Sequence, residues 1–285
     1  MSSLEDVVSL VLGERVLALR PIAGGDIADA YEAQLEGGRR AFVKTRTGAQ
    51  AGMFGAEARG LEWLSEGQAL RTPRVLGVSD GPHPLLALEM IRGSPKSPSF
   101  DEHLGRALAE LHRFGAPRFG LDHDNFIGSL PQSNRSQPTW PDFYREERLE
   151  PQVRRAVDRG LIDDRLGNDL RRLLATLDTI AGPTEPPARL HGDLWGGNVI
   201  TDENGLACLI DPAAYGGHRE VDLAMMSLFG GFGPRVFSAY EERYPLSPGH
   251  EDRLPLYQLY PLLVHVNLFG RGYVPAAERA VRALV

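Results

Sequence analysis

The sequence is poor in three features that would point to particular classes of protein: cysteine, lysine and long apolar runs. Its single cysteine, Cys208, excludes an intrachain disulfide and favours a reducing compartment. Residues 1–12 carry no basic segment ahead of an apolar core. Residues 254–269, the most apolar long stretch, are interrupted by polar side chains and are too short to span a bilayer. We therefore expect a cytoplasmic protein that is neither secreted nor embedded in a membrane.

Lysine is nearly absent although basic residues are common. Of the 31 basic residues, 29 are arginine, and only Lys44 and Lys96 are lysine. The net charge of −7 argues against broad binding to nucleic acid or to anionic membranes, although it leaves room for a locally positive cleft. Lys44 stands in the middle of an apolar run, where a compact ammonium group can have a specific task.

The chain divides by pattern into a β-rich part and a helical part. A Pro- and Ser-rich segment, residues 93–99, lies between them and resembles a linker. Before it, periodicity predicts strands over 15–21, 28–35, 40–45, 74–79 and 85–90, and helices over 1–13 and 52–66. After it, the patterns predict helices over 100–114, 139–158, 162–181, 220–230, 232–243 and 250–269, with a hairpin of strands 198–201 and 207–210. We predict an α+β fold of two lobes, residues 1–91 and 92–285, around a cleft.

The segment with the clearest chemistry is His-Gly-Asp-Leu-Trp-Gly-Gly-Asn, residues 191–198. It has the spacing H-x-D-L-x-x-x-N of a kinase catalytic loop. In that chemistry the aspartate, here Asp193, accepts the proton of the attacking hydroxyl, and the asparagine, here Asn198, holds Mg²⁺. The alternative is a buried loop aspartate that only accepts backbone N–H bonds.

A second acidic residue follows the predicted hairpin. Asp211, in Ile-Asp-Pro-Ala, ends its second strand, so the hairpin returns it beside Asn198. A carboxylate and an amide oxygen at one place suit a hard cation. An Asp-Pro pair after a strand is also a common turn, but the two motifs in this order favour a phosphoryl-transfer site.

Lys44 completes this pattern from the N-terminal part. Ala-Phe-Val-Lys resembles the strand whose lysine contacts the α- and β-phosphates of ATP, and Glu57, 13 residues later, is its expected partner. The turn at Gly24 and Gly25 could let backbone N–H groups approach phosphates. The alternatives are an edge-strand lysine in solvent and a plain hairpin turn. Asp222, at the start of a predicted helix, either supplies a helix N-terminal charge or braces the catalytic loop.

With these motifs, the sequence resembles a known family, the fructosamine kinases or ketosamine-3-kinases, which are related to aminoglycoside phosphotransferases and choline kinases. The resemblance covers residues 15–273 and includes H-G-D-L-W-x-G-N, the later D-P-A and G-H-x-E segments, and the Asn-Phe-Ile-Gly motif that begins at Asn125. It implies a bilobal protein-kinase-like fold and ATP-dependent phosphorylation of the C3 hydroxyl of a ketosamine. Such a phosphate is unstable and releases the amine, which links the family to protein deglycation.

The resemblance also implies roles for individual residues, with ATP and Mg²⁺ as cofactors. It places adenine against Glu89, Met90 and Ile91, and the ATP phosphates against Lys44, which Glu57 holds. It gives Asp193 the role of base, Asn198 and Asp211 the role of metal ligands, and Trp195, His265 and Asn267 contacts with the substrate. It leaves His191 and Asp222 as structural support.

The chain departs from kinase and family patterns at a few positions. Gly192 replaces the arginine that binds an activation-loop phosphate in protein kinases, and Pro212-Ala213 replaces Phe-Gly, which fits a constitutively active small-molecule kinase. Val264 and Leu268 stand where the family often has polar residues, which leaves the sugar open.

The sequence is also compatible with two other functions. A kinase of the same fold could act on another amino alcohol, such as an aminoglycoside or a choline-like amine. A non-catalytic nucleotide-binding protein is the other rival, and the joint presence of Lys44, Asp193, Asn198 and Asp211 argues against it.

Overall fold

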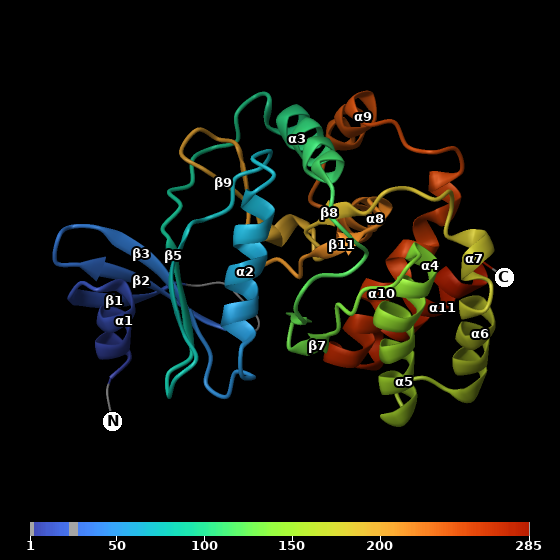
Figure 1. Ribbon diagram of the computed structural model, residues 1–285, viewed down its shortest axis with the longest axis horizontal. Coiled ribbons are helices and arrows are strands. Elements are labelled where there is room, and N and C mark those ends of the chain that lie inside the picture. The colour runs from blue at the N-terminus through green and yellow to red at the C-terminus, as the bar shows by residue number, and fades with distance from the viewer. Residues whose placement is uncertain (1–2, 23–27, 285) are drawn as a thin grey trace.

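The N-terminal part is a five-stranded antiparallel sheet with strand order β1-β2-β3-β5-β4 (Figure 1). The computed structural model describes residues 3–22 and 28–284. The strands are β1 (Val16–Ile22), β2 (Asp29–Leu35), β3 (Arg40–Thr45), β4 (Val75–Ser79) and β5 (Leu85–Glu89), and the helices are α1 (Leu4–Leu12) and α2 (Met53–Ser65).

Helices cover the sheet on both of its faces. Successive side chains of a strand point to opposite faces, so the apolar run of β5 serves two small cores. Leu85 and Ala87 pack with the α1 residue Val8, whereas Leu86 and Leu88 pack with Phe54 of α2. The same alternation in β3 places Lys44 on the face that α2 covers.

The connection from the sheet to the rest of the chain runs from the end of β5 at Glu89 to the start of α3 at Phe100. Its backbone lies along the hairpin of β9 and β10. The Ser94 N–H donates to the Asp202 carbonyl at 3.2 Å, and the Thr201 hydroxyl donates to the Ser94 carbonyl at 2.7 Å. The middle of the connection, at Ser94, is therefore bonded to the helical part.

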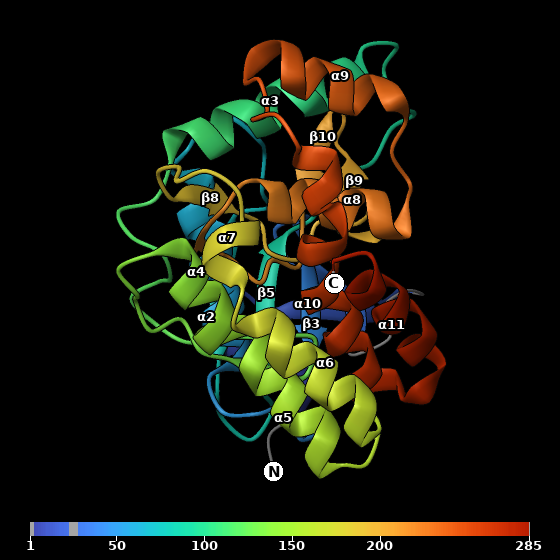
Figure 2. The same ribbon diagram turned by 90° about the vertical axis from the view of Figure 1, so that its right-hand side faces the viewer.

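The remainder of the chain is mainly helical and carries three short two-stranded sheets (Figures 1 and 2). Its helices are α3 (Phe100–Phe114), α4 (Trp140–Phe143), α5 (Glu150–Asp158), α6 (Asp164–Leu174), α7 (Leu177–Ile180), α8 (Glu220–Phe229), α9 (Pro234–Arg243), α10 (His250–Phe269) and α11 (Val274–Arg282). Its strands are β6 (Asn125–Ile127), β7 (Leu130–Gln132), β8 (Ala188–Leu190), β9 (Val199–Thr201), β10 (Ala207–Leu209) and β11 (Tyr215–Gly217). A π-helical turn, Tyr144–Leu149, joins α4 to α5, and 3₁₀ turns lie at Gly196–Asn198 and Arg271–Tyr273.

Two hydrophobic cores organise this part. The larger core gathers α5, α6, α10 and α11, and α10 supplies side chains such as Leu256 and Leu263. The second core lies under α3, α8 and α9, where α3 and α9 pack side by side in both views (Figures 1 and 2). The catalytic segment predicted from the sequence lies between these cores, in the loop after β8.

The α+β fold class predicted from the sequence is confirmed, and the division at residue 91 stays a prediction. The expected helix over 139–158 is divided by the π-helical turn, and the one over 162–181 is divided into α6 and α7. The short strands β6, β7, β8 and β11, and helix α11, were not predicted. Within residues 3–22 and 28–284, no helix has the length and apolarity needed to cross a membrane.

Candidate active site

The loop after β8 owes its shape to close backbone contacts. β8 pairs with β11, and the Ala213 N–H donates to the His191 carbonyl at 3.0 Å. Gly192 has φ +81°, and a Cβ atom there would lie 2.1 Å from the Ala213 carbonyl oxygen. Only glycine fits this left-handed, crowded position. The position that holds arginine in protein kinases is therefore closed to any side chain here.

Asp222, at the start of α8, braces this loop from behind. Its carboxylate accepts hydrogen bonds from the backbone N–H of His191 at 2.8 Å, from that of Gly192 at 2.9 Å, and from His112 Nε2 at 3.2 Å. Burial alone would raise the pKa of Asp222, but the hydrogen bond from His112 and the neighbouring imidazoles hold it below its usual value. Asp222 thus stays ionised and has the geometry of a brace.

His191 fixes the next turn of the loop through both ring nitrogens. Its Nε2 lies 2.9 Å from the carbonyl oxygen of Ile210, which can only accept, so Nε2 carries the proton. Its Nδ1 accepts the backbone N–H of Asp193 at 3.3 Å. Burial lowers the pKa of His191 and favours this neutral form. The ring therefore connects the catalytic loop to the strand end that carries Asp211.

Asp193 and Asn198 meet within the loop. The Asn198 Nδ2 group donates to the Asp193 carbonyl at 2.8 Å and to its carboxylate at 3.1 Å. The Ile210 N–H donates to the Asn198 carbonyl at 3.0 Å, which joins the loop to the end of β10. The 3₁₀ turn and this pairing bring Asp193, Asn198 and Asp211 together.

Lys44 reaches this group from the sheet. Its ammonium lies 3.0 Å from Glu57 Oε2 on α2 and 3.0 Å from Asp211 Oδ1. Burial alone would lower the pKa of Lys44, but the two carboxylates raise it, so the side chain stays charged. The three groups join the sheet, α2 and the catalytic region at one cation. The solvent alternative for Lys44 is therefore excluded.

The carboxylates of Asp193 and Glu57, which lie in this negatively charged group, both have raised pKa values. Burial raises the pKa of Asp193 to about 7, with the charges of Asp211 and Asp222 adding to the effect, while the hydrogen bond from Asn198 opposes it. Burial also raises the pKa of Glu57, against the attraction of Lys44. A carboxylate with a pKa near neutrality can accept and return a proton at physiological pH.

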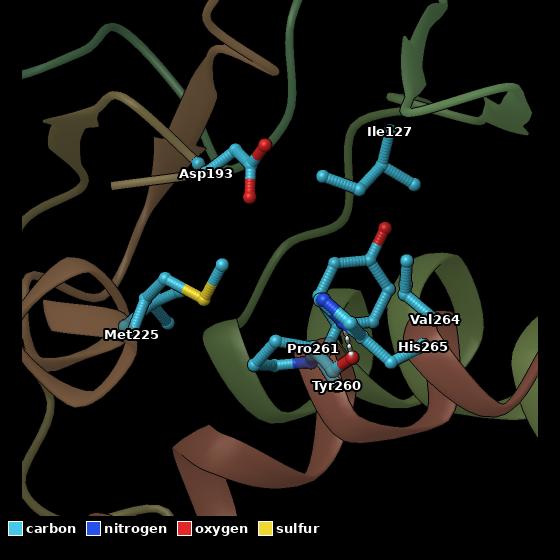
Figure 3. A pocket seen from close by; sticks show the side chains of 9 residues that line it. Ile127, Asp193, Met225, Tyr260, Pro261, Val264 and His265 are labelled. Atoms are coloured by element: carbon cyan, nitrogen blue, oxygen red, sulfur yellow. Dashed lines mark hydrogen bonds between the residues drawn. The ribbon is translucent and has the colours of Figure 1, made fainter. Parts of the chain in front are cut away.

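A small pocket opens beside the Asp193 carboxylate (Figure 3). Its walls are mostly apolar and come from β6, the catalytic loop, α8 and α10. The lining residues are Ile127, Gly192, Asp193, Val221, Met225, Tyr260, Pro261, Val264 and His265. Its volume is about 10 Å³, room for about one water molecule, so it can receive only the end of an acceptor that reaches the carboxylate.

The three residues expected to contact the substrate lie in different places. His265 lines the pocket and donates from Nδ1 to the Pro261 carbonyl at 2.8 Å (Figure 3). Asn267 is buried elsewhere and donates to Gln152 Oε1 of α5 at 2.9 Å. Trp195 is 41% exposed and is absent from the residues that line this pocket. Its ring packs over Gly197, where a Cβ atom would lie 2.3 Å from it.

The chain as a whole matches one known protein family. The family model described as fructosamine kinase matches residues 2–285. The chain belongs to the fructosamine kinase family. It is 39% identical to a "Probable ketoamine kinase" of Lactiplantibacillus plantarum over 92% of each chain. It is 37% identical to the chloroplastic protein-ribulosamine 3-kinase of Arabidopsis thaliana over 92% of this chain and 81% of that protein.

Solved structures agree with this assignment. The crystal structure of a candidate fructosamine-3-kinase from Thermobifida fusca YX-ER1 has a TM-score of 0.91 and 42% identity, and covers 99% of this chain and 98% of that one. A macrolide 2'-phosphotransferase type I, at 18% identity and a TM-score of 0.66, shares the fold alone. This fructosamine kinase family member is therefore a phosphotransferase of kinase-like fold.

The residues expected to hold adenine and to form the phosphate turn have mixed surroundings in the structure. Met90 and Ile91 are half-buried directly after β5. The Glu89 carboxylate is engaged by Arg71 at 2.9 Å and by the Arg74 N–H at 3.2 Å, so its side chain is not free for adenine. Gly24 and Gly25 lie outside the described residues.

The donor set around Asn198 and Asp211 fits Mg²⁺. The Asn198 amide donates through Nδ2, which leaves Oδ1 as an oxygen ligand, and the Asp211 side chain is 43% exposed. Across the described part of the chain, no group of three or more His, Cys, Asp or Glu side chains could hold a metal. Mg²⁺ is typically bound by one or two carboxylates together with substrate phosphates and water, so a sparse set suits it.

The segment that begins at Asn125 contributes only to the family resemblance in the sequence, and its side chains received no individual role there. Asn125 and Gln132 hydrogen-bond to the chain just after Asp211, and Tyr260 and Met225 line the pocket. The Asn-Phe-Ile-Gly motif was the available signal, because buried amide side chains require partners.

Proposed function

We propose that this protein transfers the γ-phosphoryl group of ATP to the C3 hydroxyl of a ketosamine, with Asp193 as the base. The observation that carries the proposal is the meeting of Asp193, Asn198, Asp211 and Lys44 beside a small pocket, in a chain of the fructosamine kinase family. The name of the Arabidopsis relative, a protein-ribulosamine 3-kinase, supports the position of the hydroxyl.

Asp193 has the charge and environment for its proposed step. Its carboxylate accepts the proton of the acceptor hydroxyl as that oxygen forms a bond to the γ-phosphorus, and the bond from phosphorus to the ADP oxygen breaks. The pKa of about 7 allows it to take this proton and later release it to water. The bond from Asn198 Nδ2 orients the carboxylate.

Lys44, Asn198 and Asp211 form the phosphate side of the proposed site. The Lys44 ammonium, fixed by Glu57, supplies a positive charge for the α- and β-phosphates. Asn198 and Asp211 would hold Mg²⁺, which neutralises charge that develops on the phosphate oxygens. We propose no other cofactor.

The apolar pocket beside Asp193 is proposed to receive only the end of the acceptor that carries the reacting hydroxyl, because its volume is about 10 Å³. Apolar walls suit the C–H faces of a sugar chain, and His265 adds one polar group. Trp195, which is exposed near the loop, is proposed to flank the part of the substrate that extends beyond the pocket. A substrate on a free amine or on a protein side chain would fit this open arrangement, which agrees with a role in deglycation.

Mass spectrometry after incubation with Mg-ATP tests the proposal. Ribuloselysine and fructoselysine are offered with an aminoglycoside and choline, and NMR locates any phosphate added. Phosphate on C3 of a ketosamine is the expected result. Turnover of only the aminoglycoside or choline, or none of any acceptor despite Mg-ATP binding, would overturn it. In the same assay, the variant Asp193→Asn tests the proposed base. Its matched control is Asp164→Asn, on the exposed face of α6, which should leave turnover unchanged.

A further inference from the structure

A row of buried amide side chains lies behind the loop that carries Asp211. Asn125 of β6 and Gln132 of β7 are paired residues of one short hairpin and are 5% and 2% exposed. Gln132 Nε2 donates to Asn125 Oδ1 at 2.7 Å, and Asn134 Nδ2 donates to the same oxygen at 3.0 Å. Buried amides at this density are costly unless each is satisfied, so their placement is specific.

The row ends on one side at the backbone that follows Asp211. Asn125 Nδ2 donates to the Ala214 carbonyl at 2.8 Å, and Gln132 Nε2 donates to the Ala213 carbonyl at 3.2 Å. From the opposite side, the Ala213 N–H donates to His191. The segment that sets the direction of Asp211 is thus held between the amides and the catalytic loop.

The row ends on its other side at the acceptor pocket. The Tyr260 hydroxyl donates to Gln132 Oε1 at 2.6 Å, and the ring of Tyr260 lines the pocket. In Figure 3 this hydroxyl points away from Pro261 and toward the segment of Ile127, which belongs to the same hairpin. Gln132 therefore bonds to a pocket wall through its oxygen and to the Asp211 segment through its nitrogen.

A buried cation fixes the far end of the row. The Arg148 guanidinium donates to Asn134 Oδ1 at 2.6 Å and to the Ser133 carbonyl at 2.6 Å. It also stacks 3.8 Å from the centre of the Tyr215 ring. These bonds fix the base of the hairpin, so a displacement at Tyr260 is passed on at Gln132 rather than absorbed there.

We propose that Gln132 is a positioning residue that couples the acceptor pocket to the metal-binding segment. Acceptor in the pocket restrains Tyr260, which holds Gln132, which holds the carbonyl of Ala213 and so the direction of Asp211. This inference rests on the proposed function, because it takes the pocket as the acceptor site and Asp211 as a metal ligand. Coupling between two sites is reciprocal, so acceptor tightens metal binding as much as metal tightens acceptor binding.

The test measures Mn²⁺ affinity by electron paramagnetic resonance, with β,γ-methylene-ATP present and with or without ribuloselysine. In the wild-type protein we expect acceptor to tighten Mn²⁺ binding by about fivefold or more. Tyr260→Phe removes only the hydroxyl, and Gln132→Glu keeps the shape but removes both donated bonds. Both variants should bring the factor close to one.

The matched control is Tyr144→Phe, which removes another buried tyrosine hydroxyl, one that donates to the Leu256 carbonyl at 3.0 Å. It should keep the full coupling. A wild-type protein without coupling, or a Tyr260→Phe variant that keeps it, would overturn the inference. If the Gln132→Glu variant does not fold, the test still stands on Tyr260→Phe, which is the milder change. Absence of ketosamine turnover in the wild-type protein instead overturns the proposed function.

Discussion

Asp193 and Asp222 are two aspartates of one catalytic region whose pKa values shift in opposite directions. Asp193 faces the pocket and receives one side-chain hydrogen bond, from Asn198, and its pKa is raised to about 7. Asp222 lies behind the loop and accepts from two backbone N–H groups and from His112, and its pKa is lowered. Both carboxylates are buried, so the hydrogen-bond donors and the neighbouring charges, rather than burial, decide which of them has a pKa near neutrality.

The surroundings of Asp193 and Asp222 also differ in their balance of charge. Near Asp193, the single cation of Lys44 faces both Glu57 and Asp211, so negative charge is in excess. Behind the loop, Glu220 of the same helix has a cation of its own, the bidentate partner Arg253, and Asp222 has its three hydrogen-bond donors. The proposed site therefore carries an excess of negative charge, whereas the carboxylates behind the loop are satisfied by a cation or by hydrogen-bond donors.

The largest test of this comparison is Asp193→Asn. Loss of the base should lower kcat by about 10²–10⁴-fold, because the amide cannot accept the hydroxyl proton. The free energy of unfolding and the affinity for ATP should stay close to wild-type values, since only the bond from Asn198 is altered. Steady-state kinetics with denaturant titration measure all three. A near wild-type rate would remove Asp193 from its role.

Lys44→Arg tests whether the cleft side needs a compact cation. A planar guanidinium cannot place one charge 3.0 Å from both Glu57 and Asp211 in the same way, so kcat/KM for ATP should fall by roughly ten- to a hundredfold. The matched control is Lys96→Arg in the exposed linker, the same change at the chain's other lysine. Equal kinetics for the two variants would show that the lysine at 44 is incidental.

Asp222→Asn should reverse the pattern seen for Asp193. The amide would direct an NH₂ group at backbone donors, at a cost of about 3 kcal/mol in the free energy of unfolding. Urea titration measures that loss against Asp164→Asn. If the variant unfolds at the wild-type midpoint yet loses activity, Asp222 acts in the chemistry and the comparison fails.

The smallest predicted effect is on the pH dependence of stability. The pKa of Asp222 is lower in the folded than in the unfolded chain, so its contribution is complete above the unfolded value of about 4. It is lost as pH falls through the folded pKa. The stability gap between wild-type and Asp222→Asn should therefore be constant near neutrality and shrink below pH of about 4. A gap that grows on acidification contradicts this sign.

The parts of the fold that sequence could predict are those with a strong period. The alternating strands of the sheet and helix α10, predicted over 250–269, recur as such. β8 and β11 are three residues each, which is too short to show an alternating pattern in the sequence. They pair because the chain returns to Leu190 at Tyr215, 25 residues later. Contacts this remote in sequence are set by tertiary packing.

The sequence predicts the site where the chemistry fixes the spacing of residues within a motif. It does not predict which way a side chain points from its helix. Asp193 and Asn198 belong to one motif, and the structure brings them together. His265 and Asn267 were assigned together to the substrate, but residues two apart on a helix point to nearly opposite sides. His265 consequently lines the pocket while Asn267 bonds to α5.

Asp211 adopts a left-handed backbone conformation, with φ +54°. A side chain with Cβ costs roughly 1–2 kcal/mol there, and glycine would relieve that cost. Replacement by glycine would also leave Lys44 and Glu57 as an electrically neutral pair. Directed evolution that selects for thermal stability alone is therefore drawn toward glycine at this position. A library for this enzyme retains the carboxylate of Asp211, the proposed metal ligand, only when turnover is screened alongside melting.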